Sequence, residues 1–596
     1  MARLLRRGTR LREQGQHASA RLSRWRGIWA LAGLLVTITL YRIGEYDTGN
    51  WVLLAFVAGF LAVAAYHNRL EHQIHRIGLW LALKQTHLAR LHLDWPSLPA
   101  DKPVEQDAPL YARDLDLRGP RSLLHLLDTT ISTHGRGRLA AWLLDSPPSE
   151  DVWRRRQQLV RELARRPLFR DRLTIEAQRT GQAELDGHRL TAVLQHDLPL
   201  PSLHLLLPVQ AVLALTTLTL GLAALVNWLP GYWMFSFALY VMILFHTDQG
   251  EELLEHAIGL HHAVDQLQAV LRELERRAQP PGTALALACE PLSRAEIAPS
   301  RALHGLARVF HAISVKAHPL VHLLLNALGP WDLFFLSRLR IHQRTLATLL
   351  PVWLDRLAEV EAASALATFA ALHPSYTWPE PTPAAGVAGT HLGHPLIPAS
   401  QRVTNDVTLS GLGTVHLVTG SNMSGKSTFL RTIGINLCLA QAGAPVCASR
   451  FTWSWCRLAC CIRVDDSLDA GLSFFYAEVK RLKAILAATQ ERSGLPVLFL
   501  IDEIFKGTNN RERLIGSRAY IGALANGHGY GLVTTHDLEL TDLERSIPGL
   551  RNSHFQETVD AGTLTFDYTL RPGPCPTTNA LRIMEMEGLP IRTSDR

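Results

Sequence analysis

Cysteine is scarce in this chain, and its spacing carries little information. The 596 residues include seven cysteines, and none of them lies in a Cys-x-x-Cys pair. The sequence therefore contains no disulfide framework and no zinc signature. Cys460 and Cys461 are adjacent and cannot easily bridge each other, so we expect free thiols in a reducing compartment.

Most of the chain lacks an excess of positive charge. The net charge of +7 arises within residues 1–26, which hold eight arginines and one acid, and residues 27–596 carry 52 basic and 52 acidic side chains. A chain-wide basic surface for nucleic acid is therefore not indicated. Locally, residues 153–172 hold eight arginines against two acids, which fits a contact with phosphates, a contact with anionic lipid, or an ordinary solvated helix face.

Charge is absent altogether from Leu198 to Thr247. Two apolar runs in this stretch, 203–226 and 234–245, flank the turn-like sequence NWLPGYW at 227–233. A membrane-spanning helix needs about 20 mainly apolar residues, whereas even deep core helices usually keep a polar stripe. We therefore predict a transmembrane hairpin at 203–246, with a pair of buried core helices as the alternative.

Two more apolar runs, 27–41 and 51–66, follow the arginine-rich tail. No small-residue cleavage site follows the first run, which disfavours a signal peptide. Aromatic residues that suit the membrane interface border both runs: Trp25, Trp29, Tyr41, Trp51 and Tyr66. The positive charge on either side keeps the tail in the cytoplasm, so four spans are predicted, with two spans or none as alternatives.

The remaining pattern divides the chain into a helical part and an α/β part. Residues 251–278 have the three- and four-residue apolar spacing of an amphipathic helix. A proline-rich stretch, 373–386, interrupts the helical pattern, and apolar strands such as TVHLVTG and LPVLFLIDE follow it. The predicted domains are a basic tail (1–26), a first transmembrane hairpin (27–66), a juxtamembrane helical segment (67–104), an all-α lever domain (105–385) containing the second hairpin (203–246), and an α/β P-loop domain (386–596).

The sharpest motif is GSNMSGKS, residues 420–427, which fits G-x-x-x-x-G-K-[ST] between a predicted strand and a predicted helix. The glycines let backbone N–H groups surround phosphates, and the helix N-terminus favours anions. Lys426 would reach the β- and γ-phosphates, and Ser427 would complete a Mg²⁺ shell. The predicted ATP-binding residues are Gly420, Ser421, Asn422, Met423, Ser424, Gly425, Lys426, Ser427 and Thr428.

Two later strand ends supply the other predicted catalytic groups. Asp502 follows VLFLI and would hold Mg²⁺ with Ser427, while Glu503 would orient or deprotonate the attacking water. His536 follows a third apolar strand, where a histidine can contact the γ-phosphate. We predict catalytic roles for Lys426, Glu503 and His536, the alternatives being a solvated acidic turn and an ordinary strand-end histidine.

Four segments together resemble the ATPase domain of the MutS family of ABC-type ATPases: TGSNMSGKSTFLRT, DDSLDAGLSFFYAEVKRL, IDEIFKGTNNRERL and TTHDLELTDL. The resemblance is strong over 388–570, and residues 115–148 are similar to the start of the family's helical core. It implies a head-to-head dimer in which Ser473 reaches the γ-phosphate bound to the other subunit. It also implies that Asn422 holds the family's distinctive P-loop position and that Gly507, Thr508 and Asn509 couple the two sites.

The chain departs from the family pattern in two places. The family's mismatch-reading module precedes the helical core, where this chain has the arginine tail and two apolar runs, so we expect no such module. The one Phe-x-Glu sequence, at Phe555 to Glu557, lies in the ATPase region and is interpreted as coincidence. The family's adenine-stacking aromatic is replaced by SQRVTND, where Arg402 or Val403 would pack on the base.

The sequence thus predicts a membrane-anchored, MutS-related, Mg²⁺-dependent P-loop ATPase. We expect a multi-pass protein of the cell (inner) membrane with its ATPase domain in the cytoplasm, dimerising through that domain. DNA, either duplex or branched, is the first predicted partner of the levers. The alternative is a mechanochemical or scaffold ATPase acting on a protein partner or the bilayer. A transporter fits less well because the predicted spans contain no intramembrane charge.

Overall fold

The computed structural model describes residues 2–104, 107–180, 184–195, 203–245, 260–277, 282–293, 297–421, 423–463, 474–560 and 563–576. It divides into two compact units, each assembled from three chain segments. Unit 1 comprises Met1–Pro99, Leu168–Arg277 and Leu292–Trp353, and unit 2 comprises Ala100–Pro167, Ala278–Pro291 and Leu354–Arg596. The predicted helical domain 105–385 therefore contributes to both units.

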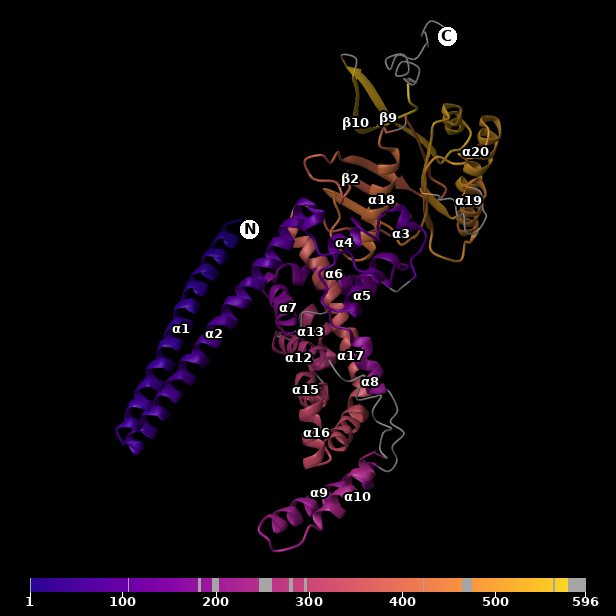
Figure 1. The fold of residues 1–596 in the computed structure, drawn as a ribbon. Coiled ribbons are helices and arrows are strands. Elements are labelled where there is room, and N and C mark those ends of the chain that lie inside the picture. The colour runs from indigo at the N-terminus through magenta and orange to yellow at the C-terminus, as the bar shows by residue number, and fades with distance from the viewer. Residues whose placement is uncertain are drawn as a thin grey trace. The chain divides into compact units, whose positions relative to one another are not determined.

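Unit 1 begins with a helical hairpin formed by α1 (Ala2–Arg42) and α2 (Tyr46–His92), which lie side by side (Figure 1). The arginine-rich tail and the first apolar run form one continuous helix. Glycines allow the close approach: a Cβ on Gly33 would lie 2.6 Å from the Phe56 ring, and one on Gly59 would lie 2.8 Å from Trp29. Small residues at a helix contact are typical of helix pairs in membranes.

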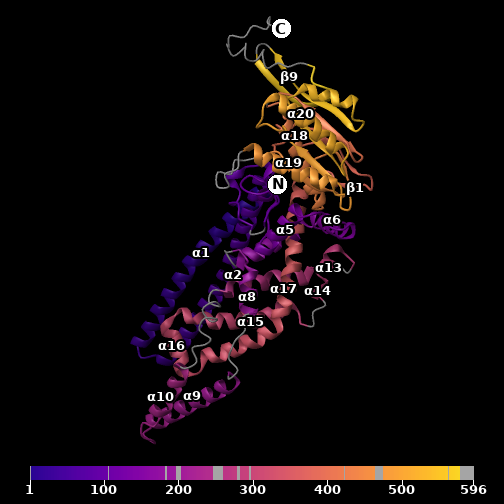
Figure 2. The same ribbon diagram turned by 90° about the vertical axis from the view of Figure 1, so that its right-hand side faces the viewer.

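The other helices of unit 1 include a second hairpin. Its arms are α9 (Leu203–Leu225) and α10 (Trp233–Phe245), joined by the NWLPGYW segment (Figure 2). Further elements are α7 (Pro167–Thr180), α8 (Gly187–Gln195), α12 (Leu260–Arg277), α14 (Glu290–Ser293), α15 (Pro299–Ile313), η3 (Ser314–Ala317), α16 (Pro319–Leu328) and the first part of α17 (Trp331–Leu372). The predicted helix 251–278 is present as α12, and residues 251–259 lie outside the described residues.

Over the described part of the chain, two helices are long and apolar enough to cross a membrane: α2 and residues Leu205–Leu225 of α9. A third candidate is the pair formed by Leu320–Leu328 and α17, which is bent by 86°. Helix α10 is apolar but shorter, and the apolar run of α1 is continuous with the arginine tail. The four predicted spans correspond to α1, α2, α9 and α10, and their number stays a prediction.

The helices of unit 2 that precede its sheets include one with a buried carboxylate, Glu361. They are α3 (Tyr111–Asp114), α4 (Leu123–Leu127), α5 (Thr133–Leu144), α6 (Glu150–Ala164), α13 (Ala284–Ala288) and the second part of α17. Glu361 of α17 accepts hydrogen bonds from Ile131 N at 3.2 Å, Ser132 N at 3.1 Å and Ser132 Oγ at 2.9 Å. Glu361 thereby satisfies donors at the N-terminus of α5. Burial raises the pKa of Glu361 to about 7.

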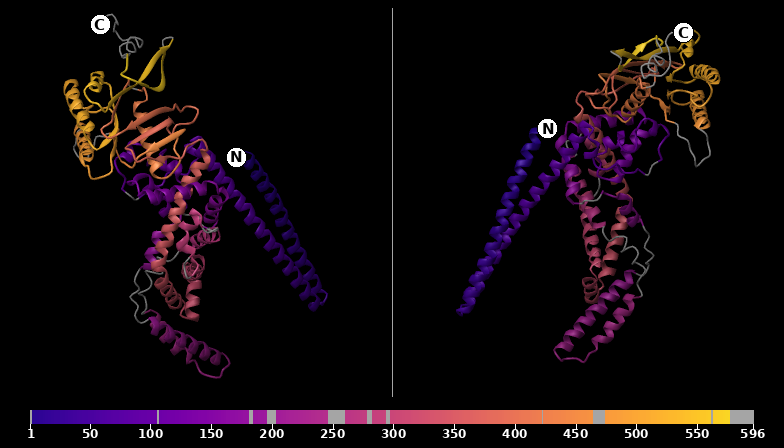
Figure 3. Two further views of the ribbon diagram at one scale, coloured as in Figure 1. Left: turned by 180° about the vertical axis from the view of Figure 1, so that it is seen from behind. Right: turned by 45° about the horizontal axis from the view of Figure 1, so that its top comes forward.

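The C-terminal part of unit 2 is an α/β domain with two sheets (Figure 3), as predicted. The smaller sheet has the order β1-β5-β2-β3, from Glu380–Pro381, Arg450–Trp453, Gly386–Leu392 and Asn405–Ser410. The larger has the order β10-β9-β4-β8-β7-β6, from Thr563–Pro572, Leu550–Asp560, Val415–Thr419, Gly529–Thr535, Val497–Ile501 and Arg457–Cys461. Its strands are parallel except β10, which pairs antiparallel with β9.

The larger sheet has a continuous apolar core. Every residue of β7 and β8 is buried, which explains the unbroken apolar sequence VLFLI of β7. Leu417, Phe499, Val533 and Ile521 belong to one cluster between the sheet and its helices. The helices in this cluster are α19 (Phe474–Gln490), α20 (Asn510–Ala525) and η5 (Leu538–Arg545), and α18 (Lys426–Gln441) also contacts β7 and β8. The sheet is thus a rigid base for the loops at its carboxyl edge.

Candidate functional site

Three neighbouring strands of unit 2 bring the predicted motifs together. Strand β8 lies between β4 and β7, and all three are parallel, so their carboxyl ends meet at one edge. Thr419 at the end of β4 is in register with Thr535 of β8, and Ile501 of β7 with Val533. The loops after these three strands therefore carry the P-loop sequence, the acidic pair and His536 to the same place, as expected for a parallel sheet.

The loop after β4 uses glycine where a side chain would collide. Gly420 has φ of 149°, and a Cβ there would lie 2.8 Å from Phe555 O. Gly425 is the N-cap of α18 with φ of 102°. Helix α18 begins at Lys426, so its free N–H groups lie at the end of this loop, where they favour an anion. Asn422 lies outside the described residues.

Lys426 is almost completely buried beneath the loop. Its Nζ donates to Gly420 O and to Ser421 O, both at 2.8 Å, and lies 3.8 Å from Glu503 Oε1. Burial lowers the pKa of Lys426, and the carboxylates of Glu503 and Asp502 oppose that shift. Two of the three N–H donors of the ammonium group thus bind carbonyl oxygens of the P-loop sequence, the same loop that is predicted to bind phosphate.

The carboxylate of Asp502 accepts hydrogen bonds from two hydroxyl groups. Ser427 Oγ donates to Asp502 Oδ2 at 2.6 Å, and Thr534 Oγ1 donates to Asp502 Oδ1 at 2.6 Å. Hydroxyl and carboxylate oxygens are hard ligands of the kind Mg²⁺ prefers. Within the described ranges no group of three or more His, Cys, Asp and Glu side chains is placed to hold a metal. These oxygens therefore fit a Mg²⁺ ion that takes its other ligands from phosphate and water.

Glu503 is held by cations and has an unusual backbone conformation. Its φ is 51°, and its N–H donates to Thr534 O at 3.1 Å and to Thr534 Oγ1 at 3.0 Å. Its carboxylate contacts Lys506 Nζ at 2.7 Å and His536 Nε2. Burial alone would raise the pKa of Glu503, but the hydrogen bonds and charges of His536 and Lys506 outweigh it and lower the pKa to about 2. Glu503 is therefore a carboxylate at neutral pH.

His536 links the ends of two strands. Its Nδ1 lies 2.9 Å from Gly420 O, and its Nε2 contacts Glu503. A carbonyl oxygen only accepts hydrogen bonds, so Nδ1 carries a hydrogen. The imidazole thus fixes the position of the Glu503 carboxylate relative to the first residue of the P-loop sequence.

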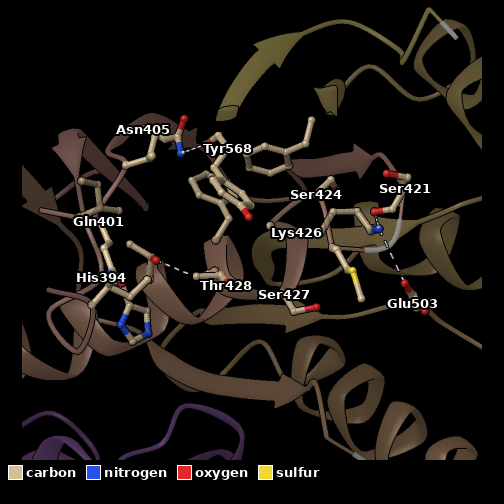
Figure 4. A pocket seen from close by; sticks show the side chains of 18 residues that line it. His394, Gln401, Asn405, Ser421, Ser424, Lys426, Ser427, Thr428, Glu503 and Tyr568 are labelled. Atoms are coloured by element: carbon tan, nitrogen blue, oxygen red, sulfur yellow. Dashed lines mark hydrogen bonds and ion pairs between the residues drawn. The ribbon is translucent and has the colours of Figure 1, made fainter. Parts of the chain in front are cut away.

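A cavity of about 370 Å³ opens beside Lys426 (Figure 4). This volume is within the usual range of small-ligand pockets, roughly 300–1,000 Å³. One end is formed by Ser421, by residues 423–428 and by Glu503. His394 and Gln401 lie at the other end, and Val403, Phe555 and Tyr568 also line the cavity. The predicted phosphate-binding loop thus forms part of a cavity large enough for a nucleotide.

Two cavity residues, Tyr568 and Asn405, were not predicted from the sequence. Asn405 Nδ2 donates to Tyr568 O at 3.0 Å, and Leu570 N donates to Asn405 Oδ1 at 2.7 Å. These bonds hold an irregular stretch of β10 in which Tyr568 has φ of 53°. A Cβ on Gly425 would lie 3.1 Å from the Tyr568 ring. The only signal in the sequence is an aromatic residue far downstream of the motifs.

The residues considered for the adenine base differ in position. Val403 lines the cavity, whereas Arg402 does not. The guanidinium group of Arg402 donates to Ile397 O at 2.6 Å and to Cys447 Sγ at 3.1 Å. Of these two residues, only Val403 is therefore placed to touch a ligand in the cavity.

The remaining predicted residues have structural partners or lie outside the described ranges. Asn509 Oδ1 accepts from Glu512 N at 3.0 Å and so caps α20, while Thr508 Oγ1 donates to Glu512 Oε2 at 2.7 Å. A Cβ on Gly507 would lie 2.7 Å from Phe475 Cβ, which accounts for a glycine there. Ser473 lies outside the described residues.

The Phe-x-Glu sequence also has a place in this site. The Phe555 ring packs on Phe429 of α18, with centroids 5.7 Å apart. Glu557 Oε2 accepts from Ser421 Oγ at 2.8 Å. Both side chains thus support the P-loop sequence, in keeping with their position in the ATPase region.

The fold and the site together define the class: an α/β domain with the geometry expected of a nucleotide-binding ATPase. The family profile described as MutS domain V matches residues 416–595. The DNA mismatch repair protein MutS of Natronomonas pharaonis is 33% identical over 245 residues, which is 40% of this chain and 28% of that protein. The proteins of the same name from Thermus thermophilus and Roseiflexus sp. are 32% identical over 246 residues and 35% identical over 178 residues.

Over its C-terminal part this chain is therefore similar to MutS domain V and to DNA mismatch repair proteins named MutS. The Thermus match covers 40% of this chain and 28% of the relative, and the Roseiflexus match covers 29% and 16%. The chain therefore spans less than a third of the length of these curated relatives.

Proposed function

We propose that this chain is a Mg²⁺-dependent, MutS-related ATPase that binds ATP in the cavity beside α18. The observation that carries the proposal is the oxygen set of Ser427, Asp502 and Thr534 next to the buried ammonium group of Lys426. Buried lysine, a glycine loop at a helix N-terminus and hard oxygen ligands are what a nucleoside triphosphate with its metal requires.

Each side chain then has a defined part in the reaction. Lys426 exchanges its hydrogen bonds to Gly420 O and Ser421 O for phosphate oxygens. Ser427 and Asp502 would hold Mg²⁺, which would supply positive charge to offset the negative charge of the phosphates. Glu503, with its pKa lowered to about 2, is a weak base, so it orients the attacking water rather than removing its proton early. His536 keeps Glu503 in position.

The dimer and the moving parts follow from the resemblance to MutS. ATP joins two ATPase domains head to head, Ser473 reaches the γ-phosphate of the other subunit, and this closure moves the helical levers. Hydrolysis resets them. The matched relatives are named as DNA mismatch repair proteins, and we propose duplex or branched DNA as the substrate of the levers, without a mismatch-reading module.

The equal numbers of acidic and basic residues in 27–596 favour a second candidate. In this version the ATPase moves a protein partner or the bilayer, and DNA has no role. Both versions place the protein in the cell (inner) membrane, held by four spans in α1, α2, α9 and α10, with the ATPase domain in the cytoplasm.

ATP hydrolysis by the full-length protein in lipid nanodiscs tests the enzymatic proposal. Activity should require Mg²⁺ and should be lost in Lys426→Ala. The control Arg545→Ala, which removes an exposed cation of η5 paired with nearby Asp542, should keep the parent rate. Parent activity in Lys426→Ala, or activity unaffected by chelation of Mg²⁺, would refute the proposal.

Binding of duplex and branched DNA to the same nanodiscs separates the two substrates. Contacts to phosphates are strongest at low salt, so affinity should fall steeply as salt rises, and it should depend on ATP. If DNA does not bind at low salt with or without ATP, the DNA version is wrong and the second candidate remains.

A further inference from the structure

The second hairpin of unit 1 places polar side chains between its two helices and exposes leucines on its outer surface. Gln210 of α9 is fully buried, and its Nε2 donates to Tyr240 O at 3.1 Å. Thr217 Oγ1 donates to Ser236 Oγ at 2.8 Å across the same helix pair. Outward positions such as Leu215 and Leu222 are more than half exposed. This is the reverse of a water-soluble helix pair and fits helices surrounded by lipid.

Helix α16 continues this reversed arrangement and touches the hairpin. Asn326 is 5% exposed, and its backbone carbonyl oxygen accepts a hydrogen bond from Tyr240 Oη of α10 at 2.5 Å. The opposite face is apolar and open: Leu320 is 83% exposed, Leu324 59% and Leu328 64%. Pro319–Leu328 contains no charged residue. The exposed surface of α16 is therefore apolar, like the exposed surface of the hairpin that it contacts.

A fixed bend ends α16. The Gly329-Pro330 pair interrupts the helix because proline has no N–H to continue it, and the axis turns by 86° into α17. Asn326 Oδ1 accepts from Asp332 N at 3.3 Å, which caps the new helix. His322 Nε2 lies 2.8 Å from Asp332 Oδ2. The polar groups of this segment thus bind one another at the bend and turn away from the leucine face.

The length of α16 decides how it can meet a membrane. Ten residues at about 1.5 Å each give roughly 15 Å, half of the roughly 30 Å apolar thickness of a bilayer. The helix is therefore too short to span. The first charged residues on either side, Lys316 and Asp332, suit the polar boundary where such a segment would enter and leave.

We propose that α16 is an interfacial helix that lies along one side of the bilayer and inserts its leucine face into one leaflet beside the α9–α10 hairpin. The partner of this surface is lipid, and the bend at Gly329-Pro330 keeps the chain on the same side. The inference rests on the proposed membrane anchoring by α9 and α10 and adds a contact that the four-span topology does not contain.

Single-cysteine labelling of the full-length protein tests this contact. The background is Cys575→Ser, since the other six cysteines are buried. Leu320→Cys and Leu324→Cys each carry a nitrobenzoxadiazole label after reconstitution into phosphatidylcholine–phosphatidylglycerol vesicles. Ile297→Cys is the matched control, because Ile297 is an exposed apolar residue just before α15 in the same unit. Leu215→Cys reports on the hairpin.

The expected result is a blue-shifted label at positions 320 and 324, quenched by doxyl-labelled phosphatidylcholine and protected from iodide. The label at position 297 should be quenched by iodide alone. Iodide quenching at 320 and 324 would overturn the inference, as would protection from both quenchers, which would mean that a second copy or another protein covers α16. Lipid quenching at 215 without lipid quenching at 324 refutes only the insertion of α16, whereas no lipid quenching at 215 refutes the membrane anchor itself.

Discussion

The hydroxyl of Ser427 donates to Asp502 Oδ2 at 2.6 Å, joining the first turn of α18 to the end of β7. These two oxygens would be neighbouring ligands of one Mg²⁺ ion. Ser427→Ala should therefore lower the ATPase rate by about two to three orders of magnitude, the usual cost of removing one electrostatic contact to a transition state. Activity as a function of Mg²⁺ concentration measures the effect. Ser546→Ala, which removes an exposed hydroxyl bonded to Leu543 O, is the control.

Glu503→Gln should bind ATP and hydrolyse it about 10² to 10⁴ times more slowly, because the amide cannot act on the attacking water as a carboxylate does. The variant should accumulate as an ATP-bound dimer, which light scattering can detect. Hydrolysis at the parent rate would show that another group performs this step.

Lys506→Ala should move the acid limb of the pH–rate profile upward. Lys506 is one of two groups that lower the pKa of Glu503, so its removal lets that pKa rise toward the ordinary value. In the parent the carboxylate is ionised down to about pH 2, and in the variant it begins to protonate at higher pH. An unchanged pH–rate profile would contradict this prediction and would mean that Lys506 does not contact Glu503 in the ATP-bound protein.

Tyr568→Ala should weaken ATP binding by up to about tenfold, because the cavity loses an aromatic wall whose contact contributes roughly 0.5–1.5 kcal/mol. Tyr568→Phe keeps the ring and should bind as the parent does. Titration with a fluorescent ATP analogue compares the three proteins. Equal affinities would place the ligand elsewhere in the cavity.

Stability should fall as pH rises through the range set by Glu361. Its pKa is raised to about 7 from the ordinary 4.5, so the folded protein holds a proton that the unfolded chain has released. The stabilisation is complete below about pH 4.5 and is lost as pH approaches 7, a change of order a few kcal/mol. Glu361→Gln should remove this slope from the thermal midpoints measured between pH 5 and 8, whereas Glu150→Gln, at the surface, should leave it unchanged.

The positions of the P-loop sequence and of Asp502 at strand ends could be predicted because their signals are local. Gly420, Gly425 and Lys426 stand at fixed spacings between a buried strand and a helix, and Asp502 ends a run of five buried residues. The rest of the cavity depends on contacts between distant segments. Tyr568 reaches it through an irregular, left-handed turn held by Asn405, more than 160 residues earlier. No short motif encodes that contact.

The helical region shows the same limit for a different reason. Hydropathy alone indicates α2 and α9, but α16 has only ten residues, below the length that signals a membrane segment. Whether α16 exposes an apolar face depends on which side of the helix packs inward. The hydrogen bond from Tyr240 of α10 to Asn326 fixes that side. The sequence also does not show that α1 runs unbroken from the arginine tail to Arg42.

The assembly of unit 2 from three separate stretches of chain bears on how the ATPase could be isolated. Trp153 Nε1 donates to Ala440 O at 2.8 Å, and Asp114 accepts from Ile462 N at 3.1 Å and Arg463 N at 3.0 Å. A fragment that starts at the proline-rich stretch, 373–386, would contain both sheets but would lack Trp153 and Asp114, which bind α18 and the residues that follow β6. The buried faces they cover would then meet water. An ATPase fragment made for biochemistry must therefore carry residues 100–167 as well, although they lie more than two hundred residues upstream.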